Sequence, residues 1–310
     1  MLKINHEIAG MHFLTDSDVQ LPHLNKPSYA KFLIEDAQPD ICYRIRALNP
    51  DFLPISPLDA ITRKLLLETI GFPAFWLERP ILHSPEVWQK VEACLDKPEL
   101  AHISLRWNRA IIRNYACNEV DFFYPPEQKV NFASPLIIAS HRNMLAAFMP
   151  NFSAVMLHGA GILCNGVAAL FFAPDDGGKS STIRLANGRP VLNDDQIILR
   201  KQNGMVIAHG TPFGPITSGP IQAKVGAIFL LEKSSHFALS RLSLSDAVEY
   251  IWNEHEHMWV VMPKALRIRA FELIADACHQ ARIYRLQFQK GYIDWNAIDD
   301  AIFKGGPYSG

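Results

Sequence analysis

A glycine-containing loop between a strand pattern and a helix pattern limits the possible folds of this chain more than any other feature. Residues 167–172 form an apolar run that ends in two phenylalanines, which is typical of a buried strand. Residues 182–187 carry Ile183 and Leu185 ahead of the helix stop signal Asn187-Gly188. The loop therefore joins a strand to a helix, and the pattern predicts an α/β fold with a mixed sheet for this part of the chain.

The loop itself matches the phosphate-loop pattern G-x-x-x-x-G-K-[ST], except that alanine stands at the first glycine position. Amide groups freed at a helix start can hold phosphate oxygens. In this interpretation the lysine reaches the outer phosphates of a nucleotide and the serine hydroxyl binds Mg²⁺. The predicted nucleotide-binding residues are Ala173, Pro174, Asp175, Asp176, Gly177, Gly178, Lys179, Ser180 and Ser181.

Two adjacent aspartates, Asp194 and Asp195, close the next apolar run at residues 190–193. A carboxylate pair in this position can bind Mg²⁺ or accept a proton during phosphoryl transfer. The alternative is an ordinary strand-turn-helix connection, with a solvated Lys179 and an Asp-Asp turn. The context of strand, loop, helix and second strand favours the phosphate site.

Asp175 and Asp176 place negative charge inside the loop. A carboxylate about 6 Å from a phosphate charge, at an effective dielectric constant of about 20, costs roughly 3 kcal/mol. We therefore expect these side chains to point outward, to meet a cation, or to weaken nucleotide binding.

Five sequence motifs resemble the HPr kinase/phosphorylase catalytic domain and, more closely, HPr-kinase-like proteins encoded beside peptide-modification systems. The resemblance covers roughly residues 135–290. The motifs are Leu157-His158-Gly159, Gly178-Lys179-Ser180, Leu192-Asn193-Asp194-Asp195, Gly210-Thr211-Pro212-Phe213-Gly214 and Tyr284-Arg285-Leu286-Gln287-Phe288.

The resemblance implies ATP and Mg²⁺ as cofactors and assigns roles to the motif residues. It places Lys179 and the loop amides on the ATP phosphates, and Ser180 on Mg²⁺. His158, which stands 21 positions before Lys179, would lie near the transferred group. Asp195 would accept the proton of the substrate hydroxyl, with Asp194 as its partner and a second metal ligand. Residues 196–215 contain no glutamate, so the metal-binding glutamate of the bifunctional enzymes is missing, and neither phosphorylase activity nor HPr as substrate is implied.

The length of 310 residues predicts two domains. Residues 1–130 contain β-prone runs at 8–14, 41–48, 103–107, 110–115 and 120–124 with two helical stretches, which indicates an α+β N-terminal domain. Pro125-Pro126 marks the expected boundary. Residues 131–310 would form the kinase-like domain. Peptide capture at an edge strand and a packing or dimerisation role are both compatible with the N-terminal domain, so a homo-oligomer is one possible state.

Charge and cysteine content narrow the class of protein. The 30 basic and 31 acidic residues are nearly balanced, so no footprint for nucleic acid or an anionic membrane stands out. The five cysteines are never closer than 23 positions, which excludes C-x-x-C motifs and favours a reduced, cytoplasmic chain. No apolar stretch approaches the 18 residues of a membrane span.

In the second half, the hairpin signal Asn165-Gly166 predicts that residues 154–163, which carry His158, pair with the strand before the loop. The alternating residues Glu254-His255-Glu256-His257 predict a polar helix end, since further metal ligands are missing from the pattern.

Taken together, these features predict an ATP-dependent kinase that phosphorylates a serine or comparable hydroxyl on a peptide or small protein. Two alternatives stay open. The first is a catalytically silent nucleotide-binding module that presents a peptide to other enzymes, which the acidic loop favours. The second is a phosphotransferase that acts on a small metabolite.

Overall fold

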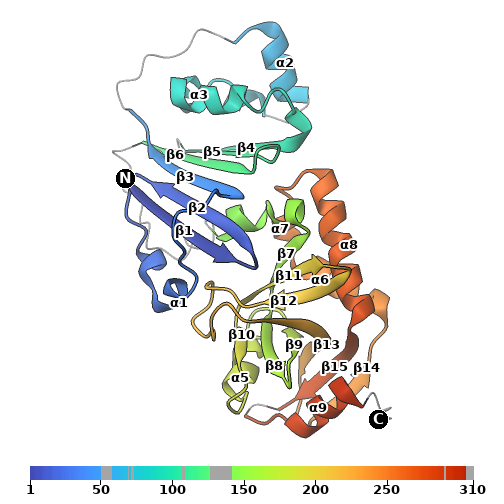
Figure 1. Ribbon diagram of the computed structural model, residues 1–310. Helices are drawn as coiled ribbons and strands as arrows, with labels where there is room; N and C mark the ends of the chain where they lie inside the picture. Colours follow the sequence, from blue (N-terminus) through green and yellow to red (C-terminus); the bar gives the residue numbers. More distant parts are fainter. Residues whose placement is uncertain are drawn as a thin grey trace.

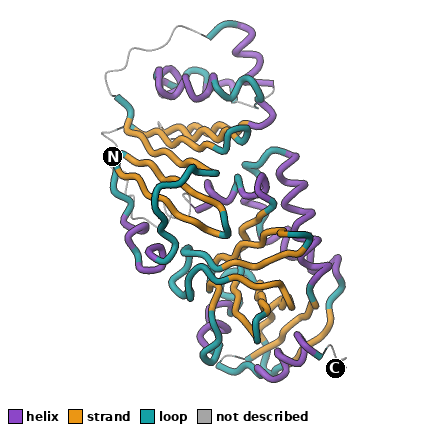
Figure 2. Tube along the Cα trace, viewed as in Figure 1, coloured by secondary structure: helices purple, strands orange, loops and turns teal. Residues whose placement is uncertain are grey.

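A computed structural model describes residues 1–49, 58–68, 70, 73–106, 109–125, 142–289 and 291–304. Two mixed β-sheets, each covered by helices, make up the molecule (Figure 1; Figure 2). This arrangement confirms the predicted α/β fold class. The expected domain boundary near residue 130, including Pro126, lies outside the described residues, so the division at that point stays a prediction.

The N-terminal sheet has six strands in the order β1-β2-β3-β6-β5-β4. The pairs β2-β3 and β3-β6 are parallel and the other pairs are antiparallel. The strands are β1 (Leu2–Ile8), β2 (Met11–Ser17), β3 (Ile41–Ala47), β4 (Ala101–Arg106), β5 (Arg109–Asn114) and β6 (Glu119–Tyr124). The helices are α1 (Pro27–Ala30), α2 (Ala60–Glu68) and α3 (Pro85–Glu92).

The predicted strand at residues 8–14 has the wrong start, because residues 11–14 lie in β2 but Ile8 ends β1. The chain turns back at Ala9-Gly10, where both residues have positive φ angles of 56° and 71°, and forms the hairpin β1-β2. A two-residue turn with both residues at positive φ matches the twist of a hairpin. The sequence does not indicate this turn, because Ala9 carries a Cβ and such residues rarely adopt a positive φ angle.

The N-terminal sheet packs on both of its faces. On one face, Leu66 of α2 and Val87 of α3 are buried with Ile103 and Ile112. The other face shares one hydrophobic core with the C-terminal half, and the Tyr115 and Phe148 rings meet there at 4.6 Å. Figure 1 shows this sheet between α2 and α3 at the top and the C-terminal half below.

Edge strands of this sheet bear on the predicted peptide capture. The outer edge of β1 bonds partly to the segment 32–34, with an isolated bridge between His6 and Leu33. The outer edge of β4 carries no strand partner among the described residues. The proposed peptide-binding role of the N-terminal half is not tested by this geometry and stays a prediction.

The C-terminal sheet follows the order β10-β8-β9-β13-β12-β11-β7, with β15 beside β13 and β14 beside β15. Strands β9, β13 and β15 are parallel to one another. The strands are β7 (Ala154–His158), β8 (Ala160–Cys164), β9 (Val167–Phe172), β10 (Val191–Asn193), β11 (Gln196–Gln202), β12 (Met205–His209), β13 (Gln222–Lys233), β14 (Ala238–Arg241) and β15 (Arg282–Phe288).

Helices cover both faces of this sheet. Ala270 and Ile274 of α8 belong to the same core as Leu170 of β9, while Ile183 of α5 and Ile298 of α9 pack with the opposite face. None of the described helices is both long and apolar enough to cross a membrane. The helices are α5 (Lys179–Arg184), α6 (Leu244–Glu254), α7 (Glu256–Trp259), α8 (Lys264–Gln280) and α9 (Trp295–Phe303).

Strand β13 joins β9 to the strands β12, β11 and β7, and it changes partners along its length. Its first residues pair with β12, and its later residues pair with β9 and β15. The register shifts between Val225 and Ala227, where a Cβ on Gly226 would approach the Val167 side chain to 2.9 Å. A β-bulge of this kind bends its strand locally.

The predicted pairing of His158 with the strand before the loop is wrong. The Asn165-Gly166 hairpin does form, but it joins β8 to β9, and His158 ends the separate strand β7. Gly159 separates β7 from β8, and a Cβ at this position would lie 2.7 Å from the Phe172 ring. Strand β7 pairs with β11 instead, and this register sets His158 opposite Gln196.

Four buried histidines and the half-buried His102 lead us to predict that the fold loses stability in acid. Burial is the main cause that lowers their pKa values from 6.5 to about 4, and the residues are His6, His23, His102, His209 and His255. Between pH 4 and pH 6.5 the unfolded chain binds more protons than the folded chain. The stabilising contribution of the neutral histidines is therefore fully present above about pH 6.5 and is lost as the pH falls to about 4. At pH 4, each pKa shift lowers the free energy of unfolding by roughly 3 kcal/mol.

Two such protonations approach the whole stability of a typical domain. We therefore expect the melting temperature, measured by circular dichroism, to fall steeply between pH 6.5 and pH 4. A melting temperature that stays constant over this range would contradict the neutral, buried state of these imidazoles.

Candidate functional site

The loop between β9 and α5 has a backbone that requires glycine at two positions. Gly178 precedes α5 with a φ angle of 107°, and Asp176 has a φ angle of 60°. A Cβ on Gly178 would overlap the Phe288 ring, and one on Gly177 would lie 2.9 Å from the Pro174 carbonyl oxygen. Glycine is therefore required at both positions, and the first residues of α5 line the adjoining cavity.

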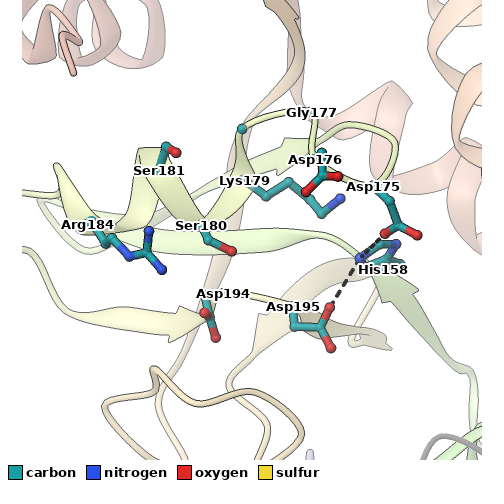
Figure 3. A pocket seen from close by; sticks show the side chains of 11 residues that line it. His158, Asp175, Asp176, Gly177, Lys179, Ser180, Ser181, Arg184, Asp194 and Asp195 are labelled. Carbon is teal, nitrogen blue, oxygen red and sulfur yellow. Dashed lines mark ion pairs between the residues drawn. The ribbon is translucent and has the colours of Figure 1, made fainter. Parts of the chain in front are cut away.

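This cavity has a volume of about 600 Å³ and brings together residues from β7, the loop, α5 and the end of β10 (Figure 3). Figure 3 shows the loop on one side and the two aspartates on the other. Ala173 and Pro174 do not line it. The lining residues are His158, Asp175, Asp176, Gly177, Gly178, Lys179, Ser180, Ser181, Arg184, Asp194 and Asp195.

Lys179 is held by the loop that precedes it. Its Nζ donates hydrogen bonds to the carbonyl oxygens of Ala173, at 2.7 Å, and Pro174, at 3.0 Å. The side chain is 6 % exposed. Burial lowers the pKa of its ammonium group, and the carboxylates of Asp175 and Asp195 oppose this shift. The two carbonyls thus fix the position of a cation at the wall of the cavity.

Asp195 lies between two basic groups on the opposite wall. Its Oδ1 is 3.1 Å from Nε2 of His158, and its Oδ2 accepts a hydrogen bond of 2.9 Å from Arg142. Burial alone would raise the pKa of this carboxyl, but the His158 hydrogen bond and the Arg142 charge outweigh burial and lower it. Asp195 is therefore ionised at neutral pH, with both oxygens oriented.

Asp194 lies in a different environment. It is 5 % exposed, and its Oδ1 accepts a hydrogen bond from the Ile216 amide at 3.1 Å. Gly214 packs so closely that a Cβ there would lie 2.5 Å from the same oxygen. Burial raises the pKa of Asp194. The turn-rich segment 210–220 therefore borders the site by shaping the surroundings of this carboxylate.

The acidic loop residues both line the cavity. The Asp175 side chain is 94 % exposed, and its Oδ1 lies 3.7 Å from Nε2 of His158. Figure 3 shows His158 between Asp175 and Asp195, with a dashed line to each. Of the three outcomes expected for the acidic loop, Asp175 combines two, since it reaches into solvent and also meets a basic group.

His255 holds the backbone at the end of β7 in place. Its Nε2 accepts a hydrogen bond from the backbone N–H of His158, and its Nδ1 lies 2.6 Å from the Ile251 carbonyl oxygen. The two contacts require the neutral tautomer with the proton on Nδ1. Burial lowers the pKa of His255 to about 4, which keeps it neutral. The residues around 254–257 thus support the site, and the described residues contain no group of three potential metal ligands.

A smaller cavity of about 220 Å³ meets the first at the His158–Asp195 pair. Three residues line both cavities: His158, Asp175 and Asp195. The remaining lining residues of the smaller cavity are Arg142, Asn143, Gln196, His257 and Met258. Groups that can accept or donate a proton therefore line both cavities.

Sequence patterns alone missed Arg142, Arg184 and His255. Arg184 lies after Lys179 on α5 and lines the same cavity. Its position just after the loop could have identified it from the sequence. Arg142 belongs to no motif. The pattern Glu254-His255-Glu256-His257 predicted a polar helix end, but His255 is fully buried, and both residues reach the site through tertiary packing.

Comparison with known proteins gives little beyond this geometry. No protein-family model and no curated protein matches the chain. A solved structure of the Hpr(Ser) kinase/phosphatase from Coxiella burnetii is similar over 48 % of this chain and 94 % of that chain, with 12 % sequence identity and a TM-score of 0.25. A likeness this loose does not carry a functional assignment, so function is inferred from the contacts around the cavity.

Proposed function

We propose that this protein is an ATP-dependent phosphotransferase that transfers the terminal phosphoryl group to a serine or comparable hydroxyl on a peptide or small protein. One observation carries the proposal. The loop at the start of α5, with Lys179, faces the His158–Asp195 pair across a single cavity of about 600 Å³.

The loop side of the cavity suits the phosphates of a nucleotide. Backbone N–H groups at the start of α5, the Lys179 ammonium and the Arg184 guanidinium provide donors and positive charge. Arg184 lines the cavity and its charge acts on the Asp194 carboxylate, so it adds positive charge where a phosphate would lie. These groups would bind the triphosphate and stabilise charge on the transferring phosphoryl group.

Donors suited to Mg²⁺ come from both walls of the cavity. Ser180 offers a hydroxyl that makes no hydrogen bond within the described residues, and Asp194 offers its second carboxylate oxygen. Hard oxygen ligands of this kind, together with phosphate oxygens, are those that Mg²⁺ prefers. When bound, the ion would neutralise phosphate charge. A nearby cation would also favour the ionised form of Asp194, whose pKa burial raises.

Asp195 is the residue best placed to receive the acceptor. The hydroxyl proton would pass to the Asp195 carboxylate as the hydroxyl oxygen bonds to phosphorus, and the bond to the leaving ADP oxygen would break in the same step. His158 and Arg142 hold the two carboxylate oxygens in place. Phosphoryl transfer needs little basicity from this group, so a low pKa is compatible with orienting the hydroxyl.

One observation favours the catalytically silent alternative. Asp175 and Asp176 both line the phosphate cavity, where their charges oppose a triphosphate. A silent module would bind a nucleotide weakly and transfer nothing.

The deciding experiment is incubation with ATP, Mg²⁺ and hydroxyl-containing candidate peptides, read by mass spectrometry. A mass gain of one phosphate on a peptide supports the kinase. Thermal stabilisation by ATP without any transfer supports the silent module, and the absence of both effects refutes nucleotide binding.

A further inference from the structure

A third cavity, of about 350 Å³, lies beside the start of the phosphate loop and shares no lining residue with the phosphate cavity. Its walls include the Pro174 ring, the side chains of Leu230, Leu231 and Leu242, and the Tyr250 ring. A cavity with mostly apolar walls and a few polar groups is typical of a ligand-binding site. Its volume can hold a side chain as large as leucine or phenylalanine.

The charged groups of this apolar cavity disfavour an anionic ligand. Glu232 and Asp246 both line it, and both residues are exposed. Arg285 also lines it, but its guanidinium forms an ion pair of 3.6 Å with Glu232. The lining residues therefore carry an excess of negative charge, which opposes phosphates and carboxylates and tolerates neutral or basic groups.

Two chain segments connect the apolar cavity to the smaller cavity of about 220 Å³ that borders Asp195. In the loop, Pro174 lines the apolar cavity and Asp175 lines the smaller one, and the Cα atoms of consecutive residues are only about 3.8 Å apart. On the facing side, α6 carries Tyr250 of the apolar cavity, and α7, which follows it, carries His257 of the smaller cavity. The two cavities are therefore neighbours.

The spacing between the two cavities matches a short stretch of extended peptide. Tyr250 and His257 lie about two helical turns, or 10 Å, apart along the α6–α7 segment. An extended chain covers about 10 Å in three residues. An acceptor whose hydroxyl lies at Asp195 would therefore place a side chain roughly two to four positions away in the apolar cavity.

Tyr250 adds a polar group that a peptide backbone can satisfy. Its hydroxyl oxygen is buried and has no hydrogen-bond partner within the described residues. Burial is the main cause that raises the pKa of Tyr250 to about 12, and the charge of Glu254 adds to it, so the hydroxyl keeps its proton. A peptide offers backbone carbonyl and N–H groups to this hydroxyl as well as an apolar side chain, whereas a pure hydrocarbon would leave it unpaired.

We infer that the apolar cavity binds a leucine- or phenylalanine-sized side chain of the acceptor peptide, roughly two to four positions from the hydroxyl that is phosphorylated. The inference rests on the proposed function, because it requires a peptide hydroxyl at Asp195. It makes a separate claim about which peptides are selected, and it favours a peptide over a small metabolite as the acceptor.

The test uses a library of serine peptides on a glycine-alanine background, with one residue varied over roughly four positions on each side of the serine. The full chain is incubated with labelled ATP and Mg²⁺, and kcat/KM is measured for each peptide. Leucine or phenylalanine at one position should raise kcat/KM roughly 10- to 100-fold over glycine, the effect of burying one large apolar side chain. Aspartate at the same position should give no increase.

Leu242→Trp, which fills the cavity, should reduce the ratio of kcat/KM between the leucine peptide and the glycine peptide to about one. This ratio does not depend on the amount of folded enzyme, so partial unfolding leaves it unchanged. Leu244→Trp is the matched control and should keep the wild-type ratio, since Leu244 is 44 % exposed two residues away and does not line the cavity. Leu242→Ala, which enlarges the cavity, should shift the preference toward tryptophan.

Phosphorylation of the peptides without any apolar preference, or a wild-type preference in Leu242→Trp, would overturn the side-chain site while the kinase proposal stands. If the wild-type protein phosphorylates none of the peptides, the proposed peptide kinase itself fails, and the inference fails with it.

Discussion

Replacing Lys179 with methionine should lower phosphoryl transfer by roughly 100- to 1,000-fold, because one preorganised charge on the transferring group is lost. The ammonium lies at the wall of the cavity, where carbonyl oxygens of the loop hold it in place. Methionine keeps the length of the side chain and removes its charge. Transfer of labelled γ-phosphate to the acceptor measures the effect.

The matched control is Lys224→Met, which removes an exposed lysine on β13 that does not line the phosphate cavity. This variant should transfer phosphate at the wild-type rate. The melting temperature of both variants, followed by circular dichroism, shows whether the fold is intact. Wild-type activity in a folded Lys179→Met protein would exclude the loop as the catalytic phosphate site.

Asp195→Asn should reduce the turnover rate by roughly 100- to 10,000-fold, the range that general-base groups contribute. The amide has nearly the same shape as the carboxylate but cannot accept the hydroxyl proton. Since the loop and Lys179 are unchanged, ATP affinity should stay within about threefold of wild type. A low turnover number with unchanged nucleotide affinity separates a catalytic role from a structural one.

Asp276→Asn is the control for this substitution, because Asp276 forms a surface ion pair of 2.6 Å with Lys201 and lies outside the cavity. It should keep the full turnover rate. If Asp195→Asn retains wild-type turnover, the proton is taken by another group, and Asp194 or His158 would replace Asp195 in the proposed reaction.

The parts of the site that could be predicted from sequence are those encoded by local patterns. The apolar run of β9, the Gly-Gly-Lys-Ser start of α5 and the Asp-Asp end of β10 lie within about 30 residues, and the structure sets Gly178, Lys179, Asp194 and Asp195 around one cavity. Glycine requirements and helix-start geometry are properties of short segments, so they can be read without knowing the fold.

The parts that could not be predicted depend on which strands become neighbours. The Asn165-Gly166 turn could be predicted. It could not be predicted that the strand ends before Gly159, so that His158 lies on β7, which pairs with β11. Arg142 and His255 approach the site from 53 and 97 positions away along the chain, measured from Asp195 and His158. No periodicity in the sequence encodes such contacts, since they depend on how distant segments pack together.

The lining residues that the two cavities share have a kinetic consequence. Because His158 and Asp195 line both cavities, a nucleotide in one cavity and an acceptor in the other could be bound at the same time. Direct transfer within such a ternary complex requires no phosphorylated enzyme intermediate. Double-reciprocal plots of initial velocity at several acceptor concentrations should therefore intersect, whereas parallel lines would indicate a ping-pong route.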